Sequence, residues 1–305
     1  AFRDRVLARI VERKHPRVGN KFKVWPLLEF SWAVDDHLLG ITHILRGKDL
    51  IIEDMMEEFI WEKLGWKKPE IIHYGLLNIK GLKLSKTQAR KAIERKEYSG
   101  WDDPRTWSLQ SLRKRGIQPA AIRKFILNMG LSLADVTVPA EILYAENRKI
   151  IDPLANRYFA ILNPIKISIK EAPKISETEA SLHPDFPERG KRKIPVNTRK
   201  IYLEKEDFEK FKDREVGLIN LFTIKLGEKA KFVSEKIEFD TQKIQWVSEP
   251  NVKIKIVMPD GTIKEAIAEP SIKNIKEDDL IQLVRVGFCR CDKVNGKIVL
   301  YFAHK

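Results

Sequence analysis

The sequence is poor in the residue types that build metal centres and disulfide frameworks. Its 305 residues include only two cysteines, Cys289 and Cys291, and six histidines. A C-x-C pair supplies two of the four ligands of a typical zinc site, and without distant histidines it cannot complete one. We therefore predict no metal site, and we expect both thiols to be reduced residues of a strand.

Long apolar runs and a secretory leader are also missing. No apolar stretch approaches the roughly 18 residues that a membrane span requires, and no signal-peptide pattern opens the chain. We expect a cytoplasmic protein that is a monomer and has no membrane partner. The chain starts at Ala1 and enters an apolar, charged pattern at once, which suggests that an upstream portion is missing.

Acidic residues are in deficit. Lysine and arginine total 57 against 43 aspartates and glutamates, a net charge of +14 with a pI near 9.6, which favours a polyanionic partner. Residues 80–130 hold thirteen basic and four acidic residues, so this segment alone carries +9. Solvated lysines on exposed helix faces are the alternative, because thermostable proteins are rich in Lys and Glu.

The N-terminal half predicts strands that give way to helices. The length and a hydrophobic content of 43% allow two or three domains with packed cores. Apolar runs at 24–33 and 40–45 predict buried strands and turns of an α/β unit. Residues 49–66 have apolar residues at helical spacing and predict an amphipathic helix that stops at Gly65. Helical patterning continues at 88–96, 109–115, 119–129 and 139–155.

After Pro153 the pattern changes to alternating strands, which predicts β-barrels or sandwiches. The predicted strands are 165–170, 199–203, 218–226, 244–248, 252–258, 280–285 and 297–302. Two turn signals, Pro259-Asp260-Gly261 and Asn295-Gly296, separate strands, and the second is typical of a hairpin. Residues 183–195 combine prolines with basic residues and predict an irregular connection exposed to solvent or to a ligand.

A short basic loop is the first candidate for chemistry. Gly81-Leu82 is followed by Lys83-Leu84-Ser85-Lys86-Thr87, between a strand-like stretch at 76–79 and a helical one. Two lysines around a serine can set positive charge and a hydroxyl against a triphosphate, where adenylyl transfer needs cationic stabilisation. By itself such a triplet in a basic protein is usually plain surface.

Several further motifs in fixed order carry a family resemblance. They are KLSKT at 83–87, DDHLLGITHILRGKD at 35–49, WDDPR at 101–105, LRKRG at 112–116, HP at 183–184, WVS at 246–248, AEPS at 268–271 and GFC at 287–289. Together they resemble the glutamyl and glutaminyl branch of the class I aminoacyl-tRNA synthetases, and the archaeal-type glutamyl enzymes most of all. The resemblance covers essentially the whole chain, which makes it far more specific than any one motif.

The resemblance implies a multidomain α/β, α and β architecture. Residues 1–50 would be the second part of a Rossmann-type catalytic domain, and 51–155 a helical region with the KLSKT loop and tRNA-contact helices. Residues 156–305 would form two β-barrels that bind the anticodon. The family's HIGH-like motif is absent from the printed sequence. On this resemblance the chain alone should not aminoacylate.

The implied reaction activates glutamate with ATP and Mg2+ and esterifies the 3′-terminal adenosine of tRNA(Glu), with tRNA(Gln) left open as a second substrate. Lys86 would stabilise the phosphates in the transition state, and Ser85, Lys83 and Leu84 would complete the ATP-binding loop. The alternative for Lys86 is a flexible surface loop.

Arg46 is the residue that bears on the choice of amino acid. The glutaminyl branch carries a small neutral residue there, whereas a guanidinium would pair with a γ-carboxylate and leave an amide poorly satisfied. A structural arginine bonded to the sheet is the alternative. Many relatives have a tyrosine that contacts the substrate where this chain has Leu28, so that contact is not carried over. Trp32 and His43 fit packing at least as well.

The predicted tRNA contacts fall in two segments. Trp101, Arg105, Arg113 and Arg115 lie in the +9 segment, and Arg189, Lys191 and Arg192 lie where the resemblance implies an anticodon-contacting turn. Phosphate contacts give affinity and register, and unstacked anticodon bases can be read by hydrogen bonds and stacking. Asp102 and Asp103 would bond to bases or sugars or cap a helix.

Two other functions remain open at this point. As an isolated chain, the protein would be a catalytically inactive tRNA-binding fragment. Glutaminyl-tRNA charging is the second, and Arg46 argues against it. An unrelated RNA-binding β protein would explain the charge but not the ordered motifs.

Overall fold

The computed structural model describes residues 4–82, 84–227, 229–293 and 296–305. The chain divides into two compact units. Unit 1 comprises residues 1–82 and 129–139, and unit 2 comprises 83–128 and 140–305. The domain boundaries expected at 50 and 155 stay a prediction.

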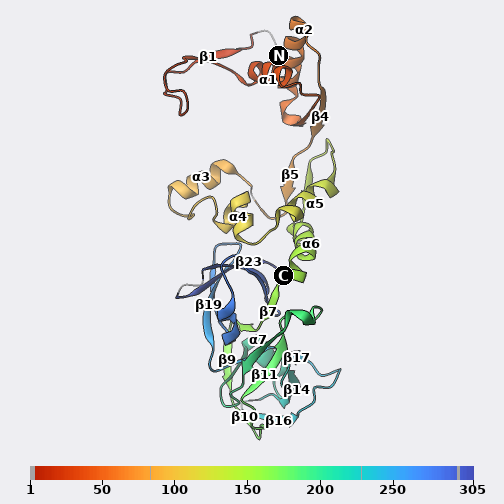
Figure 1. Ribbon diagram of the computed structural model, residues 1–305, viewed down its shortest axis with the longest axis vertical. Coiled ribbons are helices and arrows are strands. Elements are labelled where there is room, and N and C mark those ends of the chain that lie inside the picture. Colours follow the sequence, from red (N-terminus) through yellow and green to blue (C-terminus); the bar gives the residue numbers. More distant parts are fainter. Residues whose placement is uncertain (1–3, 83, 228, 294–295) are drawn as a thin grey trace. The chain divides into compact units, whose positions relative to one another are not determined.

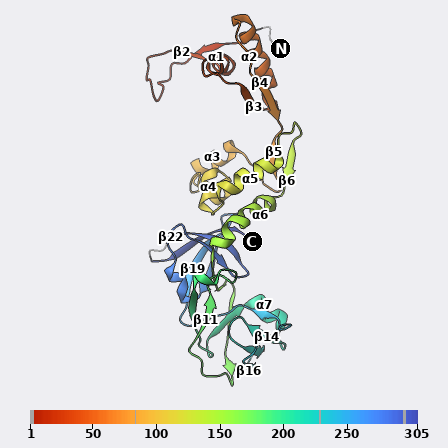
Figure 2. The ribbon, with the colours of Figure 1, turned by 45° about the vertical axis from the view of Figure 1, so that its right-hand side comes forward.

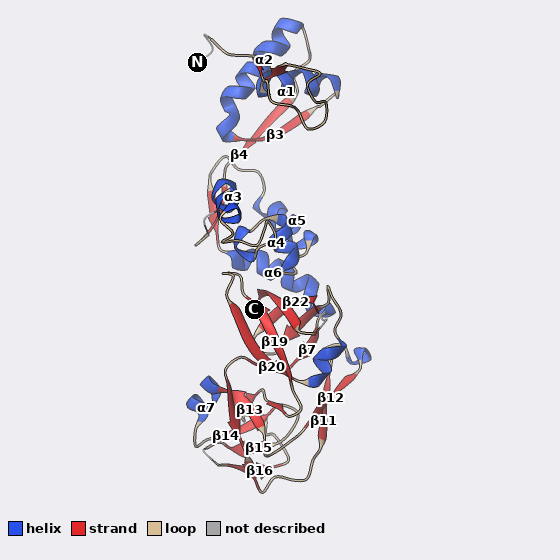
Figure 3. Ribbon diagram, turned by 90° about the vertical axis from the view of Figure 1, so that its left-hand side faces the viewer, coloured by secondary structure: helices blue, strands red, loops and turns tan. Residues whose placement is uncertain are grey.

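Unit 1 contains a small parallel pair of strands covered by two helices. Strand β3 (His43–Gly47) pairs in parallel with β4 (Glu70–Tyr74), and α1 (Leu28–Leu38) packs on α2 (Ile51–Leu64) (Figure 3). The core gathers around Trp61, whose Nε1 donates to the Ala33 carbonyl oxygen at 2.8 Å. The turn η1 (Lys48–Leu50) leads from β3 into α2.

Unit 1 also has four short strands outside this core, which form two pairs. A hairpin joins β1 (Ala8–Ile10) to β2 (Val24–Pro26), and β5 (Leu77–Ile79) pairs in parallel with β6 (Val136–Val138). Among the described residues, no helix of either unit is long and apolar enough to cross a membrane.

The helix predicted at 49–66 is confirmed. It ends at Gly65, whose φ of 63° is the left-handed conformation that ends many helices. The strands predicted at 24–33 are wrong beyond Pro26, because residues 28–38 form α1. Ala33 is its only fully buried residue, so the helix presents a narrow apolar stripe that the run of apolar letters did not reveal.

Unit 2 opens with helices. They are α3 (Lys86–Glu94), η2 (Pro104–Thr106), α4 (Leu109–Lys114), α5 (Pro119–Met129), α6 (Ala140–Ile151) and η3 (Asp152–Leu154) (Figure 2). The predicted helices are confirmed with ends shifted by a few residues. Gly116, just after α4, has a φ of 90°, and a Cβ there would lie 2.9 Å from Leu280 Cδ2. Only glycine lets the backbone approach the sheet so closely.

The rest of unit 2 is mainly β structure (Figure 1). Seven strands form one sheet in the order β7-β21-β22-β23-β19-β20-β8. Their bounds are β7 (Asn156–Tyr158), β8 (Ala160–Ile161), β19 (Val252–Val257), β20 (Ile263–Ala268), β21 (Leu280–Leu283), β22 (Gly287–Lys293) and β23 (Ile298–His304). The 3-10 helix η5 (Pro270–Asn274) follows β20. The sheet is nearly closed and barrel-like.

A second set of strands lies between β8 and β19 in sequence. Five strands are ordered β10-β16-β15-β14-β17 and three are ordered β18-β13-β9. Their bounds are β9 (Pro164–Ile167), β10 (Ile169–Lys170), β13 (Ile201–Glu204), β14 (Glu215–Leu218), β15 (Thr223–Lys225), β16 (Ala230–Ser234), β17 (Lys243–Ile244) and β18 (Val247–Ser248). Helix α7 (Lys205–Phe211) follows β13. Each strand set has its own apolar core.

The strand predictions are confirmed in outline. Residues 218–226 divide into the end of β14, a turn and β15, and residues 244–248 divide into β17 and β18. The turn around Gly261 joins the antiparallel pair β19 and β20. Strands β22 and β23 are also antiparallel, although Asn295 lies outside the described residues.

Residues 183–195 differ from the irregular connection that we expected. They form η4 (Pro187–Arg189) and β12 (Lys191–Pro195), and β12 pairs antiparallel with β11 (Glu177–Ser181). Arg192 and Ile194 lie two residues apart on the same face of β12, and both side chains are buried. The alternation in Lys191-Arg192-Lys193-Ile194 is typical of a strand, whereas the prediction of an irregular connection rested on the prolines and the basic residues.

Cys289 and Cys291 lie in β22 as free, buried cysteines, which confirms the prediction of reduced strand residues. Burial raises the pKa of both thiols, that of Cys291 to about 11. A thiol held protonated in this way is a poor nucleophile and a poor metal ligand.

Candidate functional site

The KLSKT loop leads into helix α3. Ser85 is the N-cap, and its hydroxyl accepts a hydrogen bond from the Gln88 backbone N–H at 3.3 Å. Lys86 is the first helical residue and is exposed, as is Leu84. Lys83 lies outside the described residues. A helix N-terminus with free backbone N–H groups and an exposed lysine attracts an anion such as a phosphate.

Arg46 lies near the carboxyl end of β3 and is 9% exposed. Its Nη1 donates to Asp54 Oδ1 and to Glu57 Oε1, the latter at 2.6 Å, and its Nη2 donates to Glu57 Oε2 at 3.3 Å. The guanidinium lies over the ring of Trp32, 4.4 Å from its centroid. Asp54 also pairs with His73 Nε2 from the end of β4.

The titration of these groups follows from their burial. Burial opposes the charge on Arg46, but the Glu57 and Asp54 carboxylates outweigh it and raise the pKa of the guanidinium. Burial raises the pKa of Glu57 to about 7, against the opposing pull of Arg46. The described partners of the Arg46 guanidinium are acids of α2, whereas the structural alternative expected bonds to the sheet; the glutamate contact stays a prediction.

Our sequence reasoning missed Asp54, Glu57 and His73. Asp54 and Glu57 are three residues apart in the predicted helix, a spacing that places both on one face. Both carboxylates are buried, and buried acids are rare unless they are paired. The available signal was therefore two acids on the apolar side of an amphipathic helix.

Arg105 is half-exposed and bonded to its own loop. Its Nε and Nη2 each donate to the Asp103 carboxylate at 2.8 Å, and Nη2 also donates to the Glu97 carbonyl oxygen. Asp103 caps η2 by accepting from the Arg105 backbone N–H, which confirms the capping alternative for this aspartate. Burial alone would raise the pKa of Asp103, but hydrogen bonds from Arg105 and Ser99 lower it to about 2.

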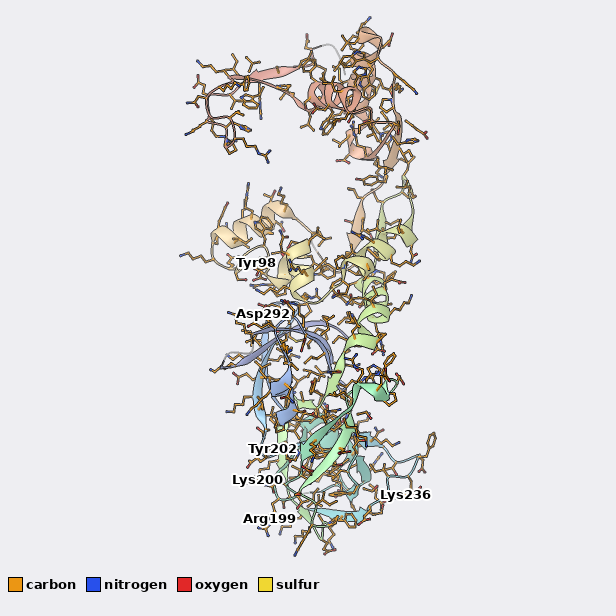
Figure 4. The ribbon with its side chains drawn as sticks, viewed as in Figure 1. Tyr98, Arg199, Lys200, Tyr202, Lys236 and Asp292 are labelled. Atoms are coloured by element: carbon orange, nitrogen blue, oxygen red, sulfur yellow. The ribbon has the colours of Figure 1, made fainter. Side chains whose placement is uncertain are left out.

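Figure 4 labels Tyr98 and Asp292, which belong to two groups of side chains in unit 2. Tyr98 lies under the Arg105 guanidinium, 4.2 Å away. Asp292 pairs with Arg290 at 3.1 Å, and the same Nη1 of Arg290 donates to the Lys114 carbonyl oxygen. Arg290 therefore ties the end of α4 to the seven-stranded sheet.

Arg115, the C-cap of α4, is fully buried, whereas Arg113 is exposed and Lys114 is partly exposed. Its Nε donates to the Phe302 carbonyl oxygen, and its Nη2 donates to the Ala303 carbonyl oxygen and the Tyr144 hydroxyl. The rings of Trp107 and Tyr144 lie 5.4 and 5.5 Å from the guanidinium carbon. No carboxylate pairs with Arg115 in the described part of the chain. A direct RNA contact by Arg115 stays a prediction, and it would require this side chain to leave its partners.

Arg113, Trp101 and Lys191 are exposed. Arg113 makes no ion pair with any described residue, and Lys191 pairs with Glu179 at 3.1 Å. Asp102 pairs with Lys114 at 2.7 Å. Arg113 is thus the predicted RNA contact with the freest charge.

Arg189 and Arg192 are held by the protein itself. Arg189 donates to the Asn156 side chain and to the Pro153 and Leu154 carbonyl oxygens. Arg192 is 6% exposed and pairs with the fully buried Glu269 at 2.6 Å. Their predicted anticodon contacts stay predictions, and only Lys191 of the three keeps a solvent-facing charge.

A cavity of 1110 Å3 lies among the shorter strands of unit 2 and has Lys170, Lys174 and Arg199 in its lining. Figure 4 labels Arg199, which lines this cavity, and the neighbouring residues Lys200 and Tyr202. Lys200 and Tyr202 bond to the Glu249 carboxylate at 2.5 and 2.8 Å. Among the described residues, no group of three or more His, Cys, Asp or Glu side chains forms a metal cage.

Comparison with known proteins assigns the parts of the chain. Residues 1–153 match the family model for tRNA synthetases class I (E and Q), catalytic domain. Residues 155–243 and 243–292 match two models that are each described as tRNA synthetases class I (E and Q), anti-codon binding domain.

The chain is also similar to curated glutamate–tRNA ligases. It is 40% identical over 310 residues to that of Methanothermobacter thermautotrophicus and 42% identical over 321 residues to that of Pyrococcus furiosus. Each comparison covers 100% of this chain and 56% of the relative, so the chain spans about half the length of the relatives it matches. A glutamate tRNA ligase structure from Elizabethkingia meningosepticum matches 43% of this chain and 31% of its own at 19% identity, but its TM-score of 0.32 is too low to support an argument.

The catalytic-domain match covers half of the chain, and the two anticodon-binding matches follow it in order. This chain therefore belongs to the class I tRNA synthetases of the E and Q group.

Proposed function

We propose that the protein to which this chain belongs is a glutamate–tRNA ligase. It activates glutamate with ATP to glutamyl-adenylate and transfers the glutamyl group to the 3′-terminal adenosine of tRNA(Glu). The observation that carries this proposal is the identity of about 40% with glutamate–tRNA ligases along the whole chain. The architecture proposed with it is a Rossmann-type catalytic domain, a helical tRNA-contact region and two anticodon-binding β-barrels.

Two features of unit 1 support the choice of glutamate. Arg46 lies at the carboxyl end of a parallel strand, the edge at which α/β sheets bind their ligands. A guanidinium satisfies a γ-carboxylate with two charge-assisted hydrogen bonds, whereas the NH2 group of a glutamine amide would face it with a second donor. Arg46 therefore favours glutamate over glutamine.

The KLSKT loop supports the use of ATP. An exposed lysine at the N-terminus of α3 provides positive charge where pyrophosphate leaves, and such charge stabilises the transition state more than the ground state. Mg2+ usually binds through substrate phosphates with only one or two protein carboxylates, so it would arrive with ATP.

The test uses the full-length gene product. We expect ATP–pyrophosphate exchange that depends on glutamate and not on glutamine, followed by aminoacylation of tRNA(Glu). Exchange that depends on glutamine alone would contradict the proposal and favour the glutaminyl alternative. Charging of tRNA(Gln) by the same preparation decides whether that tRNA is a second substrate.

A parallel measurement on residues 1–305 addresses the fragment. We expect this chain to bind tRNA without supporting exchange, and gel filtration should show a monomer. Exchange by the chain alone would show that the ATP site is complete within it. Cell fractionation tests the proposed cytoplasmic location.

A further inference from the structure

The Arg46 side chain is held by acids from one helix. Asp54 and Glu57 both come from α2, and both bond to Nη1 of the guanidinium. Glu57 adds a second bond, from Nη2 to Oε2 at 3.3 Å, so it grips the Nη1–Nη2 edge with both of its oxygens. Trp32 stacks on the face of the guanidinium at 4.4 Å. The plane and the rotation of the group are therefore both fixed.

The number of N–H groups on the Arg46 guanidinium shows which of them remain available for a ligand. A guanidinium has five N–H groups, two on each Nη and one on Nε. Three are used by Asp54 and Glu57, and no described residue accepts from Nε or from the second N–H of Nη2. These two N–H groups lie on the same edge, and that edge matches the two oxygens of a carboxylate. Arg46 can thus be a structural arginine and still bind a γ-carboxylate.

The two buried acids are more than packing requires. One carboxylate neutralises one guanidinium, yet Asp54 is 3% exposed and Glu57 is fully buried. Placing two acids against one cation in the interior costs stability, since buried charge is tolerated only with close compensation. The hydrogen bond between His73 Nε2 and Asp54 Oδ2 gives the second oxygen of this carboxylate a partner. An arrangement that costs stability is expected where function needs a fixed geometry.

We infer that Asp54 and Glu57 are positioning residues for amino-acid selection, which hold Arg46 so that its Nε–Nη2 edge is free to bind the γ-carboxylate of glutamate. The inference rests on the proposed function. Asp54 and Glu57 do not touch the substrate; they remove the freedom of the guanidinium before the substrate arrives. A preorganised donor pair discriminates between a carboxylate and an amide better than a mobile one, because the amide cannot draw the side chain into another rotamer.

The experiment compares variants of the full-length enzyme in glutamate-dependent ATP–pyrophosphate exchange. For Glu57→Gln and Asp54→Asn we expect a rise in the KM for glutamate of about tenfold or more. The KM for ATP should stay within about twofold and kcat should change less than KM. The preference for glutamate over glutamine should fall by a similar factor. Glu57→Asp keeps the charge but shortens the reach, and we expect it to recover part of the loss.

Glu62→Gln is the matched control, because Glu62 is an exposed glutamate of the same helix. We expect it to behave as wild type. If Glu57→Gln and Asp54→Asn lower the melting temperature but leave the glutamate KM and the preference unchanged, the acids only brace the fold and the inference is wrong. If one variant does not fold, the other decides.

Arg46→Lys separates this inference from the proposed function. This variant keeps the positive charge but loses the pair of parallel N–H donors, and we expect it to lose the preference for glutamate over glutamine. If Arg46→Lys and Glu57→Gln both leave selection unchanged in an enzyme that still uses glutamate, the positioning role fails and the proposed function stands. If the wild-type enzyme does not activate glutamate, the proposed function fails first.

Discussion

Among the described residues, the core of unit 1 contains five buried apolar residues, Trp61 included, whereas the two strand cores of unit 2 contain nineteen and fifteen. Leu38 and Leu39 of unit 1 are about three quarters exposed. The charged groups differ as well. In unit 1, Arg46, Asp54 and Glu57 make up a large share of the buried residues. In unit 2, the Arg192–Glu269 pair lies between extensive apolar cores. A candidate site residue therefore has different surroundings in the two units, and substitutions should separate them.

The largest effect should come from Arg192→Ala in unit 2. It leaves Glu269 buried without its cation, and breaking a buried pair in this way costs about 3–5 kcal/mol. We expect a marked drop in the free energy of unfolding, measured by urea titration of the chain. Lys191→Ala, at an exposed pair on the same strand, should change it by less than about 0.5 kcal/mol.

The same pair of variants tests the anticodon prediction. If Arg192 reads a base, Arg192→Ala should weaken the binding of tRNA that carries the native anticodon more than Lys191→Ala does, once both values are corrected for the folded fraction. Equal losses of binding for Arg192→Ala and Lys191→Ala, after correction for the folded fraction, would reduce both to general charge.

Lys86→Ala should have the next largest effect, and on activity alone. Removing one charge that stabilises a developing anion costs about 100-fold or more in rate, or roughly 2.7 kcal/mol of activation free energy. We expect exchange by the full-length enzyme to fall by this factor with the melting temperature unchanged, since Lys86 is exposed. Lys80→Ala, an exposed lysine a few residues upstream, is the control. Unchanged exchange would remove Lys86 from the ATP site.

The raised pKa of Glu57 predicts that the stability of unit 1 depends on pH in a way that the stability of unit 2 does not. Its pKa in the folded protein is about 7, above the ordinary 4.5, so the folded state binds the proton more tightly than the unfolded state does. The stability that protonation of Glu57 contributes is therefore full below about pH 4.5. It decreases as pH rises toward 7 and is absent above that pH. We expect on the order of 2 kcal/mol between pH 8 and pH 5, seen as slower hydrogen exchange of α2 amides relative to β22 at the lower pH.

Glu57→Gln should abolish this difference and Glu62→Gln should keep it. An α2 exchange rate that changes with pH in the Glu57→Gln variant just as in wild type would assign the effect to another group. Asp36 is the first candidate, since burial also raises the pKa of its carboxyl group.

Much of the fold was accessible from the sequence because periodicity reports local structure. The helix that ends at Gly65 was predicted from apolar spacing and its glycine, and the β19–β20 turn was predicted from Pro259-Asp260-Gly261. Residues 28–38 were not, since an apolar run does not distinguish a short helix from a buried strand. For the site, the sequence identified the basic residues but not their burial. Arg113 lies in α4 and Arg115 is its C-cap, and only the fold shows that the first faces solvent and the second faces Phe302.

The difference in exposure between Arg113 and Arg115 leads to the prediction with the smallest expected effect. Arg113 is exposed and unpaired among the described residues, so Arg113→Ala should remove about one phosphate contact. We expect the slope of log K against log salt for tRNA binding to fall by about 1, with little change in stability. Arg115→Met should instead lower stability and leave the slope unchanged, because methionine cannot make the bonds to two carbonyl oxygens and a hydroxyl, and a buried cation contacts no phosphate. If Arg115→Met changes the slope as much as Arg113→Ala does, the buried side chain is in contact with RNA in the complex, and exposure in the free protein is a poor guide to the tRNA-binding surface.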